Sequence, residues 1–114
     1  MSAITTHVLD TSRGRPAGGV PVVLEIRSSE GSYRELGRGV TDDDGRLRTL
    51  LPSGAPLERG TYRLTFQTGA YFALHAVEGF YPEVSVLFEV RDPAQHFHVP
   101  LLLNPFGYST YRGS

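Results

Sequence analysis

The sequence contains no cysteine and no lysine, and each absence removes a class of chemistry. Without cysteine there are no disulfides, no thiolate nucleophile and no cysteine-ligated zinc or iron–sulfur site. All 11 basic residues are arginine, so Schiff-base chemistry and a phosphate-loop lysine are also excluded. The net charge of -1 provides no basic excess for binding nucleic acid. Catalysis is left to histidine, arginine, carboxylates and hydroxyls.

Long apolar runs are absent as well. The opening MSAITTHVLD has neither the basic nor the apolar region of a signal peptide. No segment approaches the roughly 20 apolar residues that span a bilayer. A chain of 114 residues fits one domain, so we expect residues 1–114 to form a single cytoplasmic domain.

Glycine and proline are abundant, with 13 and 8 residues, and they separate short β-branched or aromatic runs. Short strand-like runs separated by glycine and proline are typical of an all-β protein. Asp42-Asp43-Asp44-Gly45 is a strong turn signal, because aspartate and glycine tolerate the positive φ of tight turns. We therefore predict a β-sandwich with eight strands: Ile4–Thr11, Val20–Ser28, Tyr33–Thr41, Arg46–Leu51, Gly60–Thr68, Glu83–Val90, Gln95–Leu103 and Phe106–Tyr111.

One segment breaks the β pattern. Ala70–Val77 contains good helix formers and no glycine or proline, which favours a short helix packed on a sheet edge. His75 lies in this segment and is expected to be exposed. We predict one short helix in an otherwise all-β chain.

A histidine pair near the end of the chain is the first candidate site. His96 and His98 flank Phe97 in an expected strand, so both imidazoles project from one face. Apolar residues on the opposite face would fix His98 on a rigid element. One interpretation is that His96 and His98 are ordinary surface histidines. If the first strand lined the same cavity, His7 would complete a three-histidine site suited to zinc.

Two further segments carry candidate residues. Arg46 follows the aspartate turn, where it either balances three carboxylates or binds a carbonyl or an anionic ring through its planar guanidinium. The segment Tyr108–Ser114 is rich in aromatic and hydrogen-bonding groups. Chain ends usually fray, but this one could fold into a pocket and bring the Ser114 carboxylate with it.

Motifs along essentially the whole chain resemble the transthyretin-related 5-hydroxyisourate hydrolases. They are Thr5–Thr11 with Gly14 and Pro16-Ala17, Asp44-Gly45-Arg46, Phe80-Tyr81-Pro82, His98–Leu102 and Tyr111-Arg112-Gly113-Ser114. The terminal tetrapeptide is the specific part of the resemblance, since it separates these enzymes from transthyretin, a hormone carrier of the same fold.

The resemblance implies an all-β, transthyretin-like β-sandwich of two four-stranded sheets with one short helix. It further implies a homotetramer whose sites lie at the interface between dimers. On the same grounds His7, Arg46, His98 and Ser114 are expected to be catalytic, and His7, Arg46, Tyr111 and Arg112 to bind substrate. No metal or other cofactor is implied.

The implied reaction is the hydrolysis of 5-hydroxyisourate to 2-oxo-4-hydroxy-4-carboxy-5-ureidoimidazoline, on the route from urate to allantoin. Such a ring opening needs an activated water, a stabilised oxyanion and a proton for the leaving nitrogen. His7 or His98 is the expected base, while the Ser114 hydroxyl and carboxylate would orient a histidine or the water. Two alternatives stay open: a transthyretin-type carrier of a small ligand, and a zinc hydrolase using His7, His96 and His98.

Overall fold

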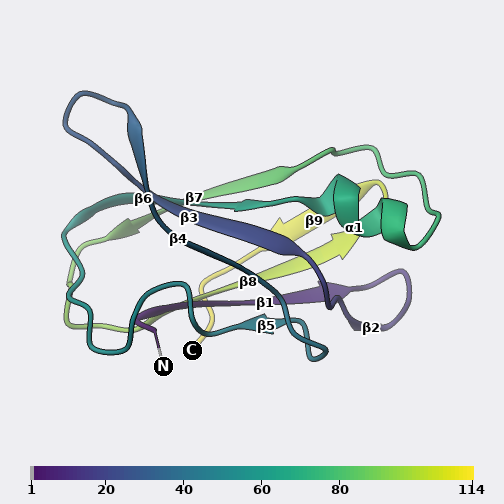
Figure 1. Ribbon diagram of the computed structural model, residues 1–114, viewed down its shortest axis with the longest axis horizontal. Coiled ribbons are helices and arrows are strands. Elements are labelled where there is room, and N and C mark those ends of the chain that lie inside the picture. Colours follow the sequence, from purple (N-terminus) through teal and green to yellow (C-terminus); the bar gives the residue numbers. More distant parts are fainter. Residues whose placement is uncertain (1) are drawn as a thin grey trace.

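The computed structural model describes residues 2–114, which form two β-sheets packed face to face with one short helix at an end of the sandwich (Figure 1). Met1, part of the expected domain, lies outside the described residues. The first sheet contains β1 (Ile4–Asp10), β2 (Arg15–Pro16), β5 (Arg46–Leu47), β8 (Phe97–Asn104) and β9 (Gly107–Thr110). The second contains β3 (Pro21–Arg27), β4 (Tyr33–Val40), β6 (Gly60–Phe66) and β7 (Val84–Val90).

Strand β1 organises the first sheet. It pairs in parallel with β8, which pairs antiparallel with β9. Along its other edge β1 pairs first with β5 and then with β2. The expected two-sheet sandwich with one helix is confirmed, but this sheet has five strands because two short strands share one edge of β1. The strand absent from the prediction is β2, a two-residue strand within a turn-rich segment.

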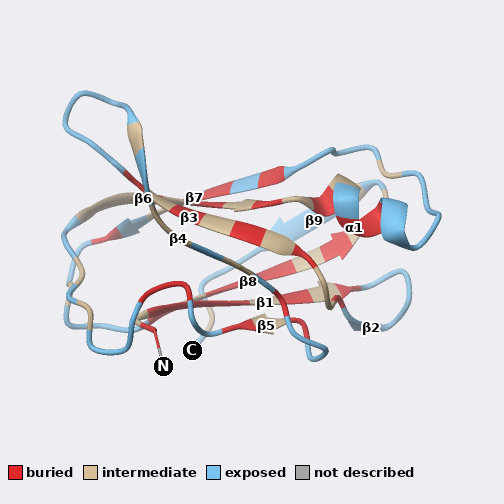
Figure 2. Ribbon diagram, viewed as in Figure 1, coloured by how far each residue is buried: buried red, intermediate tan, exposed pale blue. Residues whose placement is uncertain are grey.

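The core lies between the two sheets, as the buried stretches in Figure 2 show. Strand β3 alternates buried and half-buried residues along its length, and β6 does the same. This alternation follows from the two-residue period of a strand with one buried face. The most buried side chains of the core include Val8, Leu24, Leu64, Phe66, Leu101 and Leu103.

The predicted helix exists, with shifted ends. Helix α1 spans Thr68–Leu74, whereas the sequence predicted Ala70–Val77. It ends early because Ala76 adopts a positive φ of 55°, and the Val77 N–H then bonds back to the Phe72 carbonyl at 2.9 Å. His75 is exposed, as expected.

The observed strands are shorter than the predicted ones, and two of these differences affect the site. The segment expected as Arg46–Leu51 leaves the sheet after Leu47, and the Arg48 carbonyl accepts a hydrogen bond from the Ser2 N–H at 3.0 Å. The segment expected as Gln95–Leu103 begins its strand only at Phe97, so His96 lies just before β8. Within residues 2–114, the only helix is too short to cross a membrane.

Candidate active site

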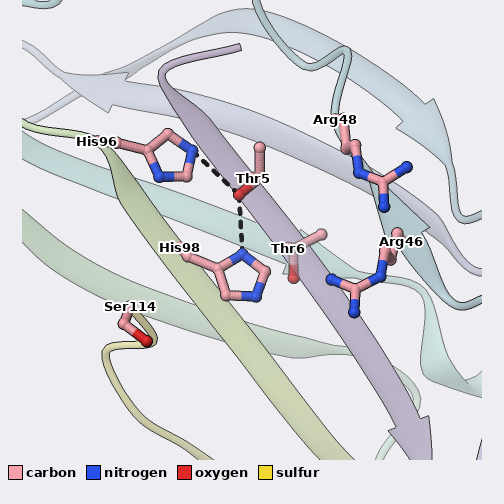
Figure 3. Close-up of a pocket in the computed structure, with 7 residues that line it drawn as sticks. All are labelled: Thr5, Thr6, Arg46, Arg48, His96, His98 and Ser114. Carbon is pink, nitrogen blue, oxygen red and sulfur yellow. Dashed lines mark hydrogen bonds between the residues drawn. The ribbon is translucent and has the colours of Figure 1, made fainter. Parts of the chain in front are cut away.

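A pocket of about 370 Å³ opens on the outer face of the first sheet (Figure 3). It is formed by β1, the start of β5, the start of β8 and the last residue of the chain. The lining is polar and partly cationic. It consists of Thr5, Thr6, Arg46, Arg48, His96, His98 and Ser114.

The strand register brings these groups together. Parallel pairing sets Thr5 beside His98, and antiparallel pairing sets His7 beside Arg46. Directly paired residues project from the same face of a sheet, and Thr5 and His7 share a face because they are two positions apart. The neighbouring Val8 and Val99 are buried in the core. The expectation that His98 lies on a core-backed strand is confirmed.

The Thr5 hydroxyl contacts both histidines of the pair. Its Oγ1 lies 2.8 Å from Nδ1 of His98 and 3.3 Å from Nε2 of His96. These contacts place His96 and His98 on the same side of the sheet, as strand alternation predicted. Figure 3 shows the hydroxyl between the two imidazole rings.

The surroundings of His98 favour its neutral form. Burial lowers the pKa of this imidazole below its ordinary value, and Coulombic interactions with Arg46, His7 and His96 lower it further. Both effects disfavour the imidazolium ion. A neutral imidazole in a polar pocket can accept a proton near neutral pH.

Arg46 is positioned by the turn before it. The Asp42 carboxylate accepts hydrogen bonds from the backbone N–H groups of Asp44 at 2.9 Å and Arg46 at 3.0 Å. The Arg46 N–H bond is the main cause that lowers the pKa of Asp42. Gly45 closes the turn with a φ of 75°. The aspartates thus build the turn that orients the arginine.

The two guanidinium groups of the pocket are available to a ligand. Among the residues that the structure describes, none forms an ion pair with Arg46 or Arg48. Arg46 and Arg48 still contribute to the lowered pKa of Asp42 through Coulombic interactions, so charge balance is part of the role of Arg46 but leaves its guanidinium without an ion-pair partner within residues 2–114. A free, half-buried guanidinium can bind a carboxylate or carbonyl oxygen through two hydrogen bonds.

The tail after β9 reaches the pocket through Gly113. Its backbone N–H donates to the His98 carbonyl at 2.8 Å, in an isolated antiparallel bridge. A Cβ at Gly113 would lie 2.6 Å from Cδ2 of His98, so only glycine permits this approach. Ser114 then lines the pocket beside His98. The expectation that the tail folds into a pocket is confirmed for Ser114.

The other two tail residues are placed elsewhere. The Arg112 guanidinium lies 4.6 Å from the centre of the Phe97 ring and donates from Nη2 to Gln95 Oε1 at 3.0 Å. Tyr111 and Arg112 line a separate hollow beside β7. Within one chain, the expected substrate-binding residues Tyr111 and Arg112 thus lie outside the histidine–arginine pocket, because the cation–π and hydrogen-bonding contacts turn Arg112 away.

His7 lies at the margin of the site. Its Nε2 is 2.8 Å from the Asp44 carbonyl oxygen, which can only accept, so the proton of a neutral His7 is on Nε2. His7 shares a face with Thr5 but does not line the pocket. No three His, Asp or Glu side chains in residues 2–114 are grouped so as to hold a metal ion. Within one chain, the described residues therefore do not bring His7, His96 and His98 together as the zinc alternative requires.

The sequence interpretation missed Thr5, Thr6 and Arg48, and it assigned His96 only to the zinc alternative. Thr5 carries no catalytic signal of its own. Its importance follows from the parallel pairing of β1 with β8, which joins residues 93 positions apart. The spacing of residues in the sequence could not have indicated that register.

The comparisons with known proteins cover almost all of the chain. A 5-hydroxyisourate hydrolase of Halalkalibacterium halodurans is 47% identical over 115 residues, covering 97% of this chain and 97% of the relative. The solved 5-hydroxyisourate hydrolase of Klebsiella pneumoniae has a TM-score of 0.84 at 42% identity, covering 97% of this chain and 98% of that one.

Transthyretin shares the fold at lower identity. Sea bream transthyretin, solved in complex with thyroxine, has a TM-score of 0.88 at 30% identity, covering 97% of this chain and 94% of that one. The family model described as HIUase/Transthyretin family matches residues 4–113. With this match and these likenesses, the chain belongs to the HIUase/Transthyretin family.

Proposed function

We propose that this protein is an enzyme that hydrolyses 5-hydroxyisourate to 2-oxo-4-hydroxy-4-carboxy-5-ureidoimidazoline in urate degradation, without a metal ion. The observation that carries the proposal is the pocket itself, where a neutral imidazole, a free guanidinium and a hydroxyl line one hollow. The curated relatives named as 5-hydroxyisourate hydrolases support the substrate. An apolar carrier channel fits a lining of two arginines and two histidines poorly.

The residues divide the chemistry as follows. The neutral His98 accepts a proton from water, whose oxygen forms a bond to a ring carbonyl carbon of the substrate. Arg46 stabilises the oxyanion that develops on that carbonyl. The ring carbon–nitrogen bond then breaks, and the proton held by His98 passes to the leaving nitrogen. Ser114 orients the water, and His7 binds the substrate ring from the edge of the pocket.

The proposal includes a homotetramer with sites at the interface between dimers. Two edge strands, β7 and β9, each have only one partner strand within the part of the chain that the structure describes. Unpaired edges are templates for pairing with another copy. Leu87 on β7 is 55% exposed, and Phe106 before β9 and Tyr108 on β9 are exposed as well. In the tetramer, Tyr111 and Arg112 contact substrate in a site shared between chains. Light scattering coupled to size-exclusion chromatography measures the assembly.

A direct assay tests the activity. Uricase generates 5-hydroxyisourate from urate, and ultraviolet absorbance follows its decay with and without the protein. We expect His98→Asn to lower the enzymatic rate by about 10²–10⁴-fold, the range for losing a general base. Arg46→Met should lower it by about 10²–10³-fold, the range for losing an oxyanion donor.

Arg15→Gln is the matched control, because Arg15 is an exposed arginine on β2 of the same sheet. It should retain the wild-type rate. The proposal is wrong if the wild-type protein leaves the spontaneous decay rate unchanged. The cytoplasmic location and the single domain of residues 1–114 stay predictions of the sequence.

A further inference from the structure

We propose that the Thr5 hydroxyl selects the tautomer of His98 and couples it to His96, which makes Thr5 and His96 positioning residues of the site. The inference rests on the proposed function for its kinetic consequences. Its structural part concerns where protons reside, and it is testable without substrate. Neither residue is among the four that the sequence indicated as catalytic.

The Thr5 hydroxyl has one proton to share between two imidazole nitrogens. Thr5 Oγ1 lies 2.8 Å from His98 Nδ1 and 3.3 Å from His96 Nε2, and these are its two hydrogen-bond partners within residues 2–114. A hydroxyl carries one proton, so it can donate to only one of the two ring nitrogens. The other nitrogen must itself donate to the hydroxyl oxygen. The protonation states of the two rings are therefore linked.

The two possible arrangements differ in what His98 can do. When Thr5 donates to His96, His98 donates from Nδ1 to Thr5, and its Nε2 is free to accept a proton from water. When Thr5 donates to His98 Nδ1, the proton of neutral His98 is on Nε2, and the base is lost. In Figure 3 the second ring nitrogen of His98 points away from Thr5, on the side of Arg46.

His96 determines which arrangement prevails. A neutral His96 can present a bare Nε2 to Thr5, which selects the arrangement in which His98 is a base. A protonated His96 can only donate. Thr5 must then donate to Nδ1 of His98, which places the His98 proton on Nε2 and removes the base. His96 is exposed to solvent, whereas His98 is half-buried and Thr5 is 3% exposed. The protonation state of the exposed His96 thus determines the tautomer of the half-buried His98 through the Thr5 hydroxyl.

Other charged groups also act on His98, and the test must account for them. They come from each element that surrounds the ring. The groups are Arg46 on β5, Arg48 after it, His7 on β1 and His96 before β8, with Ser114 from the tail. None of them is hydrogen-bonded to Nδ1, so none substitutes for Thr5 in fixing the tautomer.

The hydrogen bonds from His98 through Thr5 to His96 also provide a route by which a proton can leave the pocket. The acid formed by hydrolysis ionises, so one proton must leave the site in each turnover. A protonated His98 can pass its Nδ1 proton to Thr5 Oγ1 while Thr5 passes its own proton to His96 Nε2. One proton moves, the hydroxyl is regenerated, and His96 releases the proton to solvent. His98 is left with its remaining proton on Nε2, so this proton must exchange with solvent and the Thr5 hydroxyl must turn back to His96 before the next turnover.

The primary experiment is nitrogen NMR of histidine-labelled protein at a pH above the titration of both rings. In the wild type, we expect the His98 proton on Nδ1. In Thr5→Val, which keeps the shape and removes the hydroxyl, the proton should shift toward Nε2. Thr5→Ser should restore the wild-type tautomer. An unchanged His98 tautomer in Thr5→Val would overturn the inference, whatever the enzyme's activity.

Kinetics provide the second readout. We expect Thr5→Val to lower kcat by about 10–100-fold, less than the loss of the base itself, with KM changed little. Thr5→Ser should recover most of this rate. His96→Asn should move the acid limb of the pH–rate profile, because the gating group is gone. Thr11→Val is the control, since among the described residues 2–114 its hydroxyl bonds only the Leu103 carbonyl and no histidine.

The outcomes separate the two proposals. A tautomer shift in a protein without hydrolase activity would leave the Thr5 inference standing and reject the proposed function. Equal kcat values for Thr5→Val and Thr5→Ser in an active enzyme would reject the coupling. An acid limb in His96→Asn that matches the wild type would reject the gating role of His96.

Discussion

The backbone N–H of Gly113 donates to the carbonyl oxygen of His98 at 2.8 Å, directly behind the imidazole that faces the pocket. This bond joins the tail to the start of β8. It also explains why glycine occupies the position, since any side chain there would meet the His98 ring. The placement of Ser114 therefore depends on the contact between Gly113 and His98.

Gly113→Ala should reduce turnover without unfolding the protein. The new Cβ would lie 2.6 Å from His98 Cδ2 and 3.2 Å from Pro100 Cγ, so either the ring or the tail must move. Displacing a reacting group by about 1 Å costs up to about 10²-fold in rate, and we expect a fall in kcat of about 10–100-fold. Gly107→Ala is the control, because a Cβ there meets only the Asn104 side chain at 3.6 Å. Equal rates for the two variants would contradict the steric argument.

Arg112→Met should loosen the tail. The substitution removes the contact with the Phe97 ring and the hydrogen bond to Gln95. We expect faster hydrogen exchange of the Gly113 amide and a kcat about threefold to tenfold lower, since contacts of this kind are individually modest. Gln95→Leu should reproduce part of the effect. A higher KM with unchanged Gly113 exchange would instead indicate that Arg112 binds substrate from the interface.

His98 should titrate below the ordinary histidine value of 6.5, because burial and nearby charges both oppose its protonation. Arg46→Met removes one positive charge, so the pKa of His98 should rise while staying below that value. Proton NMR of the imidazole across a pH series measures both midpoints and needs no substrate. Arg15→Met, distant from the ring, should leave the midpoint where it is. A lower midpoint in Arg46→Met would reverse the sign predicted here.

Tyr71→Phe should destabilise the protein more at pH 7 than at low pH. Burial raises the pKa of Asp10, but hydrogen bonds from Ser12, Tyr71 and Arg13 outweigh it and lower the pKa overall. The Tyr71 hydroxyl donates to Asp10 Oδ2 at 2.7 Å, and removing it should cost about 1–3 kcal/mol.

That stabilisation belongs to the carboxylate form of Asp10. It is therefore complete above the unfolded-state pKa near 3.8 and is lost as the pH falls through the lower folded-state pKa. Urea unfolding at fixed protein concentration, at pH 7 and at low pH, measures the difference. The control is Tyr81→Phe, whose hydroxyl has no hydrogen-bond partner within residues 2–114. A loss of stability that is equal at both pH values would rule out the carboxylate as its source.

Local signals in the sequence predicted much of the fold. Period-two alternation and glycine-rich turns indicated all the longer strands, and the run around Tyr71 and Phe72 indicated the helix. The two-residue strand β2 was not predicted, because its exposed residues Arg15 and Pro16 show no alternation of apolar and polar side chains. The early end of the helix depends on the positive φ of Ala76, which no residue type at that position signals.

The site was predictable only where chemistry shows in a single residue type. Arg46, His98 and Ser114 were identified and do meet in one pocket. Thr5 was not, because a threonine in a strand looks structural until its neighbour across the sheet is known. Arg112 was expected at the pocket, but the Phe97 ring attracts its guanidinium to the other side of the strand. The residue type shows which chemistry a side chain can perform, whereas the pairing of distant strands determines whether that side chain lies in the pocket.

The parallel pairing of β1 with β8 has a further consequence for how the molecule is made. β1 is synthesised well before its parallel partner Phe97–Asn104, because β2 to β7 lie between them in the sequence. Until β8 is made, β1 lacks this partner strand, and such non-local pairing forms slowly and leaves an unpaired strand edge exposed to aggregation. A growing chain that stalls before β8 would have neither a completed sheet nor a pocket. The unpaired edge of β1 could then pair with strands of other chains.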